Sequence, residues 1–184
     1  MYAIVTLLDE PAYSKVKALW QELGLLCDMS GIDLMPLPHF SWHTANEYDV
    51  PRLRTILLQI AKQNNAFSVR TSGLGIFTGE SPVIYIPLAR NDILSSVHQQ
   101  VWRRVEPVAV DGSSHYAPEI WIPHITLAHG DVSPDRLGCA MEQLAYRQYD
   151  WEIQVDNLAL VYQIGSQIGE LLCKYPFGGG EACV

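Results

Sequence analysis

The sequence predicts an α+β fold made of two similar halves, each an antiparallel sheet with helices on its outer face. The phrase PHFS at 38–41 returns as PHIT at 123–126, an offset of 124 − 39 = 85 positions in a chain of 184. Both phrases fall on segments with strand character, and the order of strands and helices around them repeats. We therefore expect two lobes related by an approximate two-fold axis, with their sheets facing a central cleft.

The elements of the first half follow from apolar spacing and from end signals. Apolar runs rich in β-branched and aromatic residues indicate strands, whereas apolar residues three and four apart indicate helices. Pro11 and Pro51 each fall in a first helical turn, where the missing N–H is harmless. In order, we expect a strand at 2–8, a helix from 9, a strand at 39–45, a helix from 49, and strands at 67–77 and 83–88.

The second half repeats that order. Asn91 or Asp92 is a predicted helix cap, and Ser133 with Pro134 opens the last helix. In order, we expect a helix from 91, a polar loop at 111–118, a strand from 124, a helix from 133, and strands at 151–163 and 168–175. These elements predict a single bilobal domain over 1–177, in which each interleaved lobe contributes one PH phrase, and a flexible tail at 178–184.

Composition and charge limit the class of partner. The chain is 48% apolar, enough for a substantial core, and its 12 Lys and Arg face 20 Asp and Glu, for a net charge of −8. Such a surface repels extended nucleic acid, which is held by many basic contacts. An RNA-related ligand should therefore be small or held locally, and we expect the protein to be a monomer.

The cysteines and the apolar runs bear on location. Cys27, Cys139, Cys173 and Cys183 form no CxxC pair, which favours free thiols in a reducing compartment over disulfides. No apolar run approaches the roughly 20 residues needed to span a bilayer. The first residues lack a basic segment and are expected to form a strand instead of a leader. The expectation is a cytoplasmic protein with no membrane partner.

Strand alternation brings chemically useful side chains together. It predicts that His39, Ser41 and His43 share one face of the first strand, and that His124 and Thr126 share one face of the second. Two imidazoles with pKa values near 6.5 can accept and donate protons near neutral pH. Hydroxyls two residues further on can donate hydrogen bonds to an anion without adding charge.

The paired phrases resemble a known superfamily. HFS at 39–41 and HIT at 124–126 are similar to the paired H-x-S/T motifs of the two-histidine (2H) phosphoesterases, which include the 2′-5′ RNA ligase-like proteins and cyclic nucleotide phosphodiesterases. FSVRTSGLGIFTGESPVIYIPL also resembles the strand, glycine-containing bend and strand of that family, and the resemblance extends to about residue 175. It implies a bilobal α+β fold with both histidines in a central cleft.

The resemblance also implies an activity and its residues. His39 and His124 would be the acid and the base, and Ser41 and Thr126 would bind phosphate. The reaction would be hydrolysis of the 2′,3′-cyclic phosphates of small nucleotides or RNA ends, with neither metal nor other cofactor, usually to a 2′-phosphomonoester. Run backwards with an RNA hydroxyl in place of water, the same geometry gives ligation.

Three residues add to the family pattern or depart from it. Ser41 stands where the family more often has threonine, which keeps the hydroxyl donor. His43 is expected on the face of His39 from alternation alone, and could contact substrate. Tyr85, on the strand after the hairpin turn, is a further candidate for substrate binding.

Two other functions fit parts of the pattern. His39 and His43, with His124 and His129, could hold a transition metal, although their spacing converges on one ion only in a helix, and the segment favours a strand. A second alternative is a nucleotide- or RNA-binding module of the same fold without turnover. The presence of both histidines and both hydroxyls favours the enzyme.

Overall fold

A computed structural model describes residues 1–163, 165, 168–180 and 182–183. The four helices in this part are α1 (Ala12–Cys27), α2 (Val50–Gln63), α3 (Asp92–Val105) and α4 (Pro134–Leu144). Short 3₁₀ turns are η1 (Gly31–Leu34), η2 (Glu106–Val108) and η3 (Ser114–Tyr116). The strands are β1 (Tyr2–Leu7), β2 (His39–Tyr48), β3 (Phe67–Arg70), β4 (Gly75–Phe77), β5 (Val83–Pro87), β6 (Ala109–Gly112), β7 (His124–Ala128), β8 (Glu152–Val155), β9 (Asn157–Tyr162), β10 (Glu170–Pro176) and β11 (Ala182–Cys183).

The strands form one long antiparallel sheet and one short pair. The long sheet runs β11-β10-β9-β1-β2-β7-β5-β4, with β6 beside β2, and β3 pairs with β8 separately. Its two halves meet at β2 and β7, where Phe40 and Ile125 are the registered pair. The two PH phrases therefore lie on adjacent strands at the seam between the halves.

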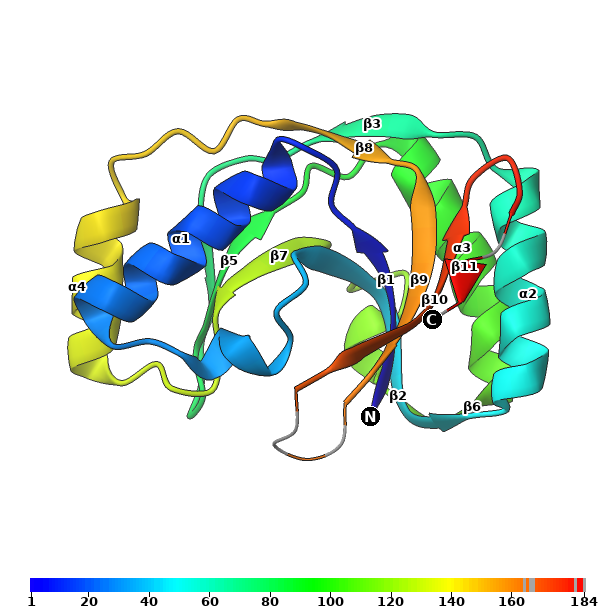
Figure 1. Cartoon of the computed structure of the whole chain (residues 1–184), viewed down its shortest axis with the longest axis horizontal. Helices are drawn as coiled ribbons and strands as arrows, with labels where there is room; N and C mark the ends of the chain where they lie inside the picture. The colour runs from blue at the N-terminus through cyan, green and yellow to red at the C-terminus, as the bar shows by residue number, and fades with distance from the viewer. Residues whose placement is uncertain (164, 166–167, 181, 184) are drawn as a thin grey trace.

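Helices cover the two halves of the sheet in pairs. In Figure 1, α1 and α4 lie together at one end of the molecule and α2 and α3 at the other. Helix α1 packs on β7, whereas α3 packs on β2 and α2 packs on β9 and β10. Each PH strand is thus backed by a helix from the other half of the sequence. This interleaving joins the lobes, and the predicted α+β fold with antiparallel sheets and outer helices is confirmed.

Several predicted segments differ in detail. The stretch 67–77 is two strands, because β3 leaves to pair with β8 and the chain turns at Gly73, whose φ is 67°. Likewise 151–163 divides into β8 and β9, which belong to different sheets. The polar stretch expected as a loop at 111–118 contains the end of β6 and the turn η3. Each difference comes from pairing with a distant strand, which local pattern does not encode.

The structure describes residues 178–180 and 182–183 of the segment predicted to be a flexible tail, and its flexibility stays a prediction. The Gly178 amide donates to the carbonyls of Ala61 and Asn64, at 3.0 Å each. Strand β11 then pairs with β10. Residues 181 and 184 lie outside the described part of the chain.

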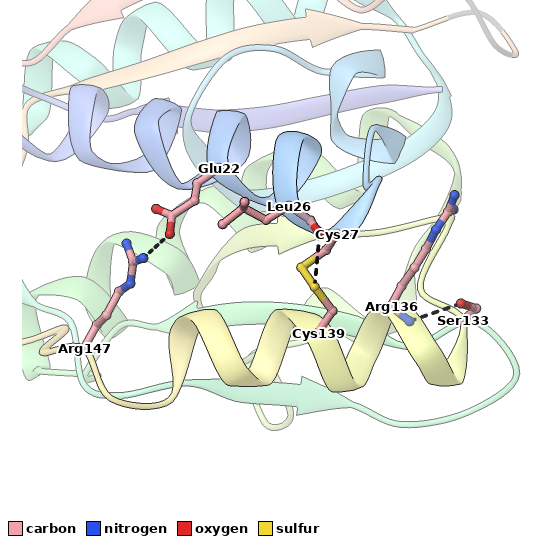
Figure 2. Close-up of a disulfide and its surroundings, with 7 residues drawn as sticks. All are labelled: Glu22, Leu26, Cys27, Ser133, Arg136, Cys139 and Arg147. Carbon is pink, nitrogen blue, oxygen red and sulfur yellow. Dashed lines mark hydrogen bonds and ion pairs between the residues drawn. A yellow bond between two sulfur atoms is a disulfide. The ribbon is translucent and has the colours of Figure 1, made fainter.

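The expectation of free thiols is wrong for Cys27, Cys139 and Cys173. Cys27 and Cys139 form a disulfide across 112 positions, and Cys173 is disulfide-bonded as well. Figure 2 shows the Cys27–Cys139 bond joining the end of α1 to the middle of α4. The Arg147–Glu22 ion pair also joins the two helical segments, and Arg136 of α4 pairs with Asp28 just after α1. Such contacts between distant parts of the chain cannot be read from cysteine spacing, which is why the sequence favoured thiols.

Among the helices of the described residues, none combines the length and the apolar character needed to cross a bilayer.

Candidate functional site

The two motifs lie on one face of the sheet at its central seam. Strands β2 and β7 are antiparallel, and Phe40 pairs with Ile125. His39 therefore lies opposite Thr126 on the neighbouring strand, and Ser41 lies opposite His124. Phe40 and Ile125 are fully buried on the opposite face. The sequence prediction that histidine and hydroxyl share a face, with the apolar residue between them in the core, is confirmed in both strands.

The prolines explain how each imidazole is oriented. His39 Nδ1 lies 2.5 Å from the carbonyl oxygen of Leu37, and His124 Nδ1 lies 2.7 Å from that of Ile122. In both places a buried proline separates the histidine from the carbonyl and holds the preceding residue extended. A carbonyl can only accept, so Nδ1 carries the proton and donates. Each ring therefore keeps Nε2 for other chemistry.

An indole fixes the backbone of each hydroxyl residue. Trp121 Nε1 donates to the carbonyl of Ser41 at 3.1 Å, and Trp20 Nε1 donates to the carbonyl of Thr126 at 3.0 Å. Trp121 precedes the second motif by three residues, whereas Trp20 comes from α1. The same device is therefore built from unrelated parts of the chain, and sequence reasoning missed both tryptophans.

A bulge follows each hydroxyl residue. On β2, Val5 pairs with Ser41 while Ile4 pairs with His43, which leaves Trp42 as the extra residue. On β7, Tyr85 pairs with Thr126 while Ile84 pairs with Ala128. An extra residue reverses the alternation beyond it.

The prediction that His43 shares the face of His39 is therefore wrong. Because of the bulge, His43 lies on the core side with 0% exposure. Its Nδ1 lies 2.5 Å from the Tyr48 hydroxyl, and its Nε2 lies 2.8 Å from Glu106 Oε2. The partners satisfy both nitrogens in a structural arrangement. His39 and His43 do not converge, and no cluster of three or more metal-ligating side chains occurs among the described residues.

Burial sets the electrostatics of the two motif histidines. Desolvation lowers the pKa of His39, the bond to the Leu37 carbonyl opposes this, and the charge of His124 lowers it further. Desolvation also lowers the pKa of His124, against the bond to the Ile122 carbonyl. The effect of His124 on His39 fits the register, which puts both residues on one face of adjacent strands. A singly protonated pair is consequently favoured.

Aromatic side chains surround His124. Tyr85 lies edge-on to His124 with ring centroids 5.2 Å apart, and Phe77 does so at 4.9 Å. Phe77 and Tyr85 stack on each other at 4.1 Å. The hydroxyl end of Tyr85 lies over Gly75, where an added Cβ would come within 2.6 Å of the oxygen. The structure thus places Tyr85 beside His124 and Thr126, as a packing partner of the imidazole.

Two further hydroxyls stand on the Ser41 side. Beyond the bulge, Thr44 returns to the face of Ser41, and it pairs with Ala3 in the register. Burial raises the pKa of the Tyr116 phenol, and hydrogen bonding to the side chains of Ser41 and Thr44 partly lowers it. Neither residue was a predicted site residue. Strict alternation from Ser41 would place Thr44 on the core face, and Tyr116 lies in a stretch expected to be a loop.

Comparisons with known proteins agree with this geometry. A family model for the 2′-5′ RNA ligase superfamily matches residues 31–167, which contain both motifs. A curated protein of Geobacillus kaustophilus, named "Putative phosphoesterase", is 24% identical over 74% of this chain and 75% of its own length.

Two solved structures share the fold. TT0787 of Thermus thermophilus matches with a TM-score of 0.67 at 18% identity, over 97% of this chain and 98% of its own. Escherichia coli LigT, complexed with 3′-AMP, matches with a TM-score of 0.58 at 12% identity, over 96% of this chain and 99% of its own. With the family model spanning well over half of the residues, the chain belongs to the 2′-5′ RNA ligase superfamily of 2H phosphoesterases.

Proposed function

We propose that this protein hydrolyses the 2′,3′-cyclic phosphates of small nucleotides or RNA ends by acid-base catalysis between His39 and His124. The observation that carries the proposal is the pair of motif imidazoles, each with Nδ1 committed to a backbone carbonyl and Nε2 left available. Ser41 and Thr126 stand beside them on the same face as neutral donors to the phosphate. The reaction as proposed needs no metal or other cofactor.

The pKa directions support one assignment of the two roles. Burial lowers the pKa of both histidines, and the charge of His124 also lowers the pKa of His39, so we assign the proton of the pair to His124. His39 Nε2 is then the base that takes the proton of the attacking water. As the water oxygen bonds to phosphorus, the bond to one ribose oxygen breaks and that oxygen takes its proton from His124 Nε2. The product is a phosphomonoester. Attack on the same ring by an RNA 5′-hydroxyl in place of water, with the same ribose oxygen leaving, would give 2′-5′ joining.

The charge of the protein favours a small substrate, because a long RNA backbone would need many basic contacts. The charged group that lowers the pKa of His39 is His124, not a lysine or an arginine, and the chain carries a net charge of −8. The LigT structure holds 3′-AMP, a nucleoside monophosphate. Both observations support a small nucleotide or an RNA end as the substrate, and the monomeric state stays a prediction. The cytoplasmic location stays a prediction, and its argument from free thiols fails for Cys27, Cys139 and Cys173.

The test is hydrolysis of the four nucleoside 2′,3′-cyclic monophosphates in excess EDTA, with 2′- and 3′-monophosphate products separated. Wild type should turn over, and His124→Ala should not, while His129→Ala, an exposed histidine beyond β7, serves as the matched control. Activity that EDTA abolishes would overturn the metal-free mechanism. Turnover that persists in His124→Ala would overturn the role of that residue.

A further inference from the structure

Tyr116 stands at the phosphate-binding side of the site although it belongs to neither motif. It ends η3, and the backbone of this segment is attached to β2, since the Ser113 amide donates to the carbonyl of Thr44 at 2.9 Å. Hydrogen bonding with Ser41 and Thr44 acts on the Tyr116 phenol. A tyrosine delivered by a separate segment thus reaches the hydroxyl of the first motif.

The hydroxyls of Ser41, Thr44 and Tyr116 could bind an anion by hydrogen bonds alone, without a lysine or arginine. Burial raises the pKa of Tyr116, so the phenol remains protonated, and a donor, at every pH at which the histidines titrate. Hydroxyls that bond to one another can rotate and donate to an incoming phosphate oxygen instead. A hydrogen bond from a hydroxyl to a charged phosphate oxygen is stronger than a hydrogen bond between two neutral hydroxyls.

The second motif has no equivalent arrangement among the described contacts. Tyr85 pairs with Thr126 in the register, but its hydroxyl end lies over Gly75 and its ring packs on Phe77. The hydroxyls are therefore concentrated on the Ser41 side, and a phosphate between the motifs would meet more donors there.

We propose that Tyr116 is a substrate-binding residue that donates a hydrogen bond from its phenol to a non-bridging phosphate oxygen beside Ser41. The inference rests on the proposed function, because it names a further contact to the same phosphate. The competing explanation is structural: the phenol would only attach η3 to β2. The two differ in whether loss of the hydroxyl changes substrate affinity or only stability.

The experiment compares wild type with Tyr116→Phe, which keeps the ring and removes the donor. With adenosine 2′,3′-cyclic monophosphate as substrate, KM should rise about 10- to 100-fold while kcat changes much less, as expected for a lost bond to a charged acceptor. The dissociation constant of 3′-AMP, measured by calorimetry, should rise by a similar factor. The double variant Ser41→Ala/Tyr116→Phe should lose more than the product of the single effects, because in each single variant the remaining donor still serves the shared oxygen.

Tyr149→Phe is the matched control, because its buried hydroxyl donates to the Leu144 carbonyl at 3.1 Å. It should lower thermal stability and leave KM unchanged. If Tyr116→Phe behaves like Tyr149→Phe, with KM and 3′-AMP affinity within twofold of wild type, the inference is overturned. If wild type hydrolyses no cyclic phosphate, the proposed function fails, and 3′-AMP binding still decides: weaker binding by Tyr116→Phe supports the contact, whereas equal or absent binding in both proteins refutes it.

Discussion

Strands β2 and β7 carry the same local design in different surroundings. In each, a proline precedes the histidine, Nδ1 donates to the carbonyl two residues back, and a bulge follows the hydroxyl residue. What differs is the neighbouring side chains. Ser41 faces Thr44 and Tyr116, whereas His124 and Thr126 lie beside Phe77 and Tyr85. Under the proposed function, the duplicated part of the site would serve proton transfer, and the parts that differ would serve substrate binding.

The two pairs of helices are also joined differently. Helix α1, which packs on β7, is joined to α4 by the Cys27–Cys139 disulfide (Figure 2). Helix α3, which packs on β2, is linked to α2 through amides, in which Gln100 accepts from Asn64 at 2.8 Å and donates to Gln63 at 2.9 Å. The two lobes share an architecture, but their helix pairs are joined by different bonds.

The largest expected effect tests the equivalence of the two histidines. His39→Ala and His124→Ala should each lower kcat on a 2′,3′-cyclic nucleotide by roughly 10² to 10⁴, the range for a general acid or base. Because both rings are held in the same way, the two losses should be comparable. Circular dichroism should show an unchanged fold. A wild-type rate in either variant would contradict the mechanism.

The next effect concerns the helix pairs. Replacing Cys27 and Cys139 together by serine should lower the free energy of unfolding by about 2–5 kcal/mol, since the bond closes a long loop. Gln100→Ala, the control in the other pair, should cost about 1 kcal/mol, because it removes hydrogen bonds that water can replace. Urea unfolding measures both. A disulfide variant no less stable than Gln100→Ala would remove the proposed difference between the lobes.

A smaller effect on KM should distinguish the hydroxyl of Ser41 from that of Thr126. Thr126→Ala should raise KM about tenfold, and Ser41→Ala by about threefold, because Tyr116 and Thr44 remain beside the Ser41 position to donate. Steady-state kinetics on one cyclic nucleotide gives both values. If Ser41→Ala has the larger effect, the extra hydroxyls do not compensate for it.

The smallest effect is a displacement of the pH optimum. Burial lowers the pKa of both histidines, and the charge of His124 lowers that of His39 further. The base must be neutral and the acid protonated, so kcat/KM should peak between two values that both lie below 6.5, the ordinary pKa of histidine. Activity should rise as His39 becomes neutral above its lowered pKa. It should fall again when the pH rises through the pKa of His124 and that residue loses its proton. An optimum above pH 7 would contradict these directions.

The sequence was sufficient for the elements that depend on local pattern. The helices at α1 to α4, their caps at Asn91 and Ser133, and the strands with the two motifs follow from spacing and end signals. So does the shared face of His39 and Ser41, because alternation holds within three residues. The repeat itself predicted that the two motifs would meet, and the sheet order places them on adjacent strands.

Tertiary structure decided the rest, because those features depend on which distant strand or helix a residue meets. The bulge at Trp42 arises from pairing with β1 and turns His43 into the core, against the prediction from alternation. The bond between Cys27 and Cys139 depends on α1 packing against α4. Tyr116 reaches Ser41 only because β6 pairs with β2. The sequence by itself determined the two motif histidines proposed as acid and base, and packing determined which side chains surround them.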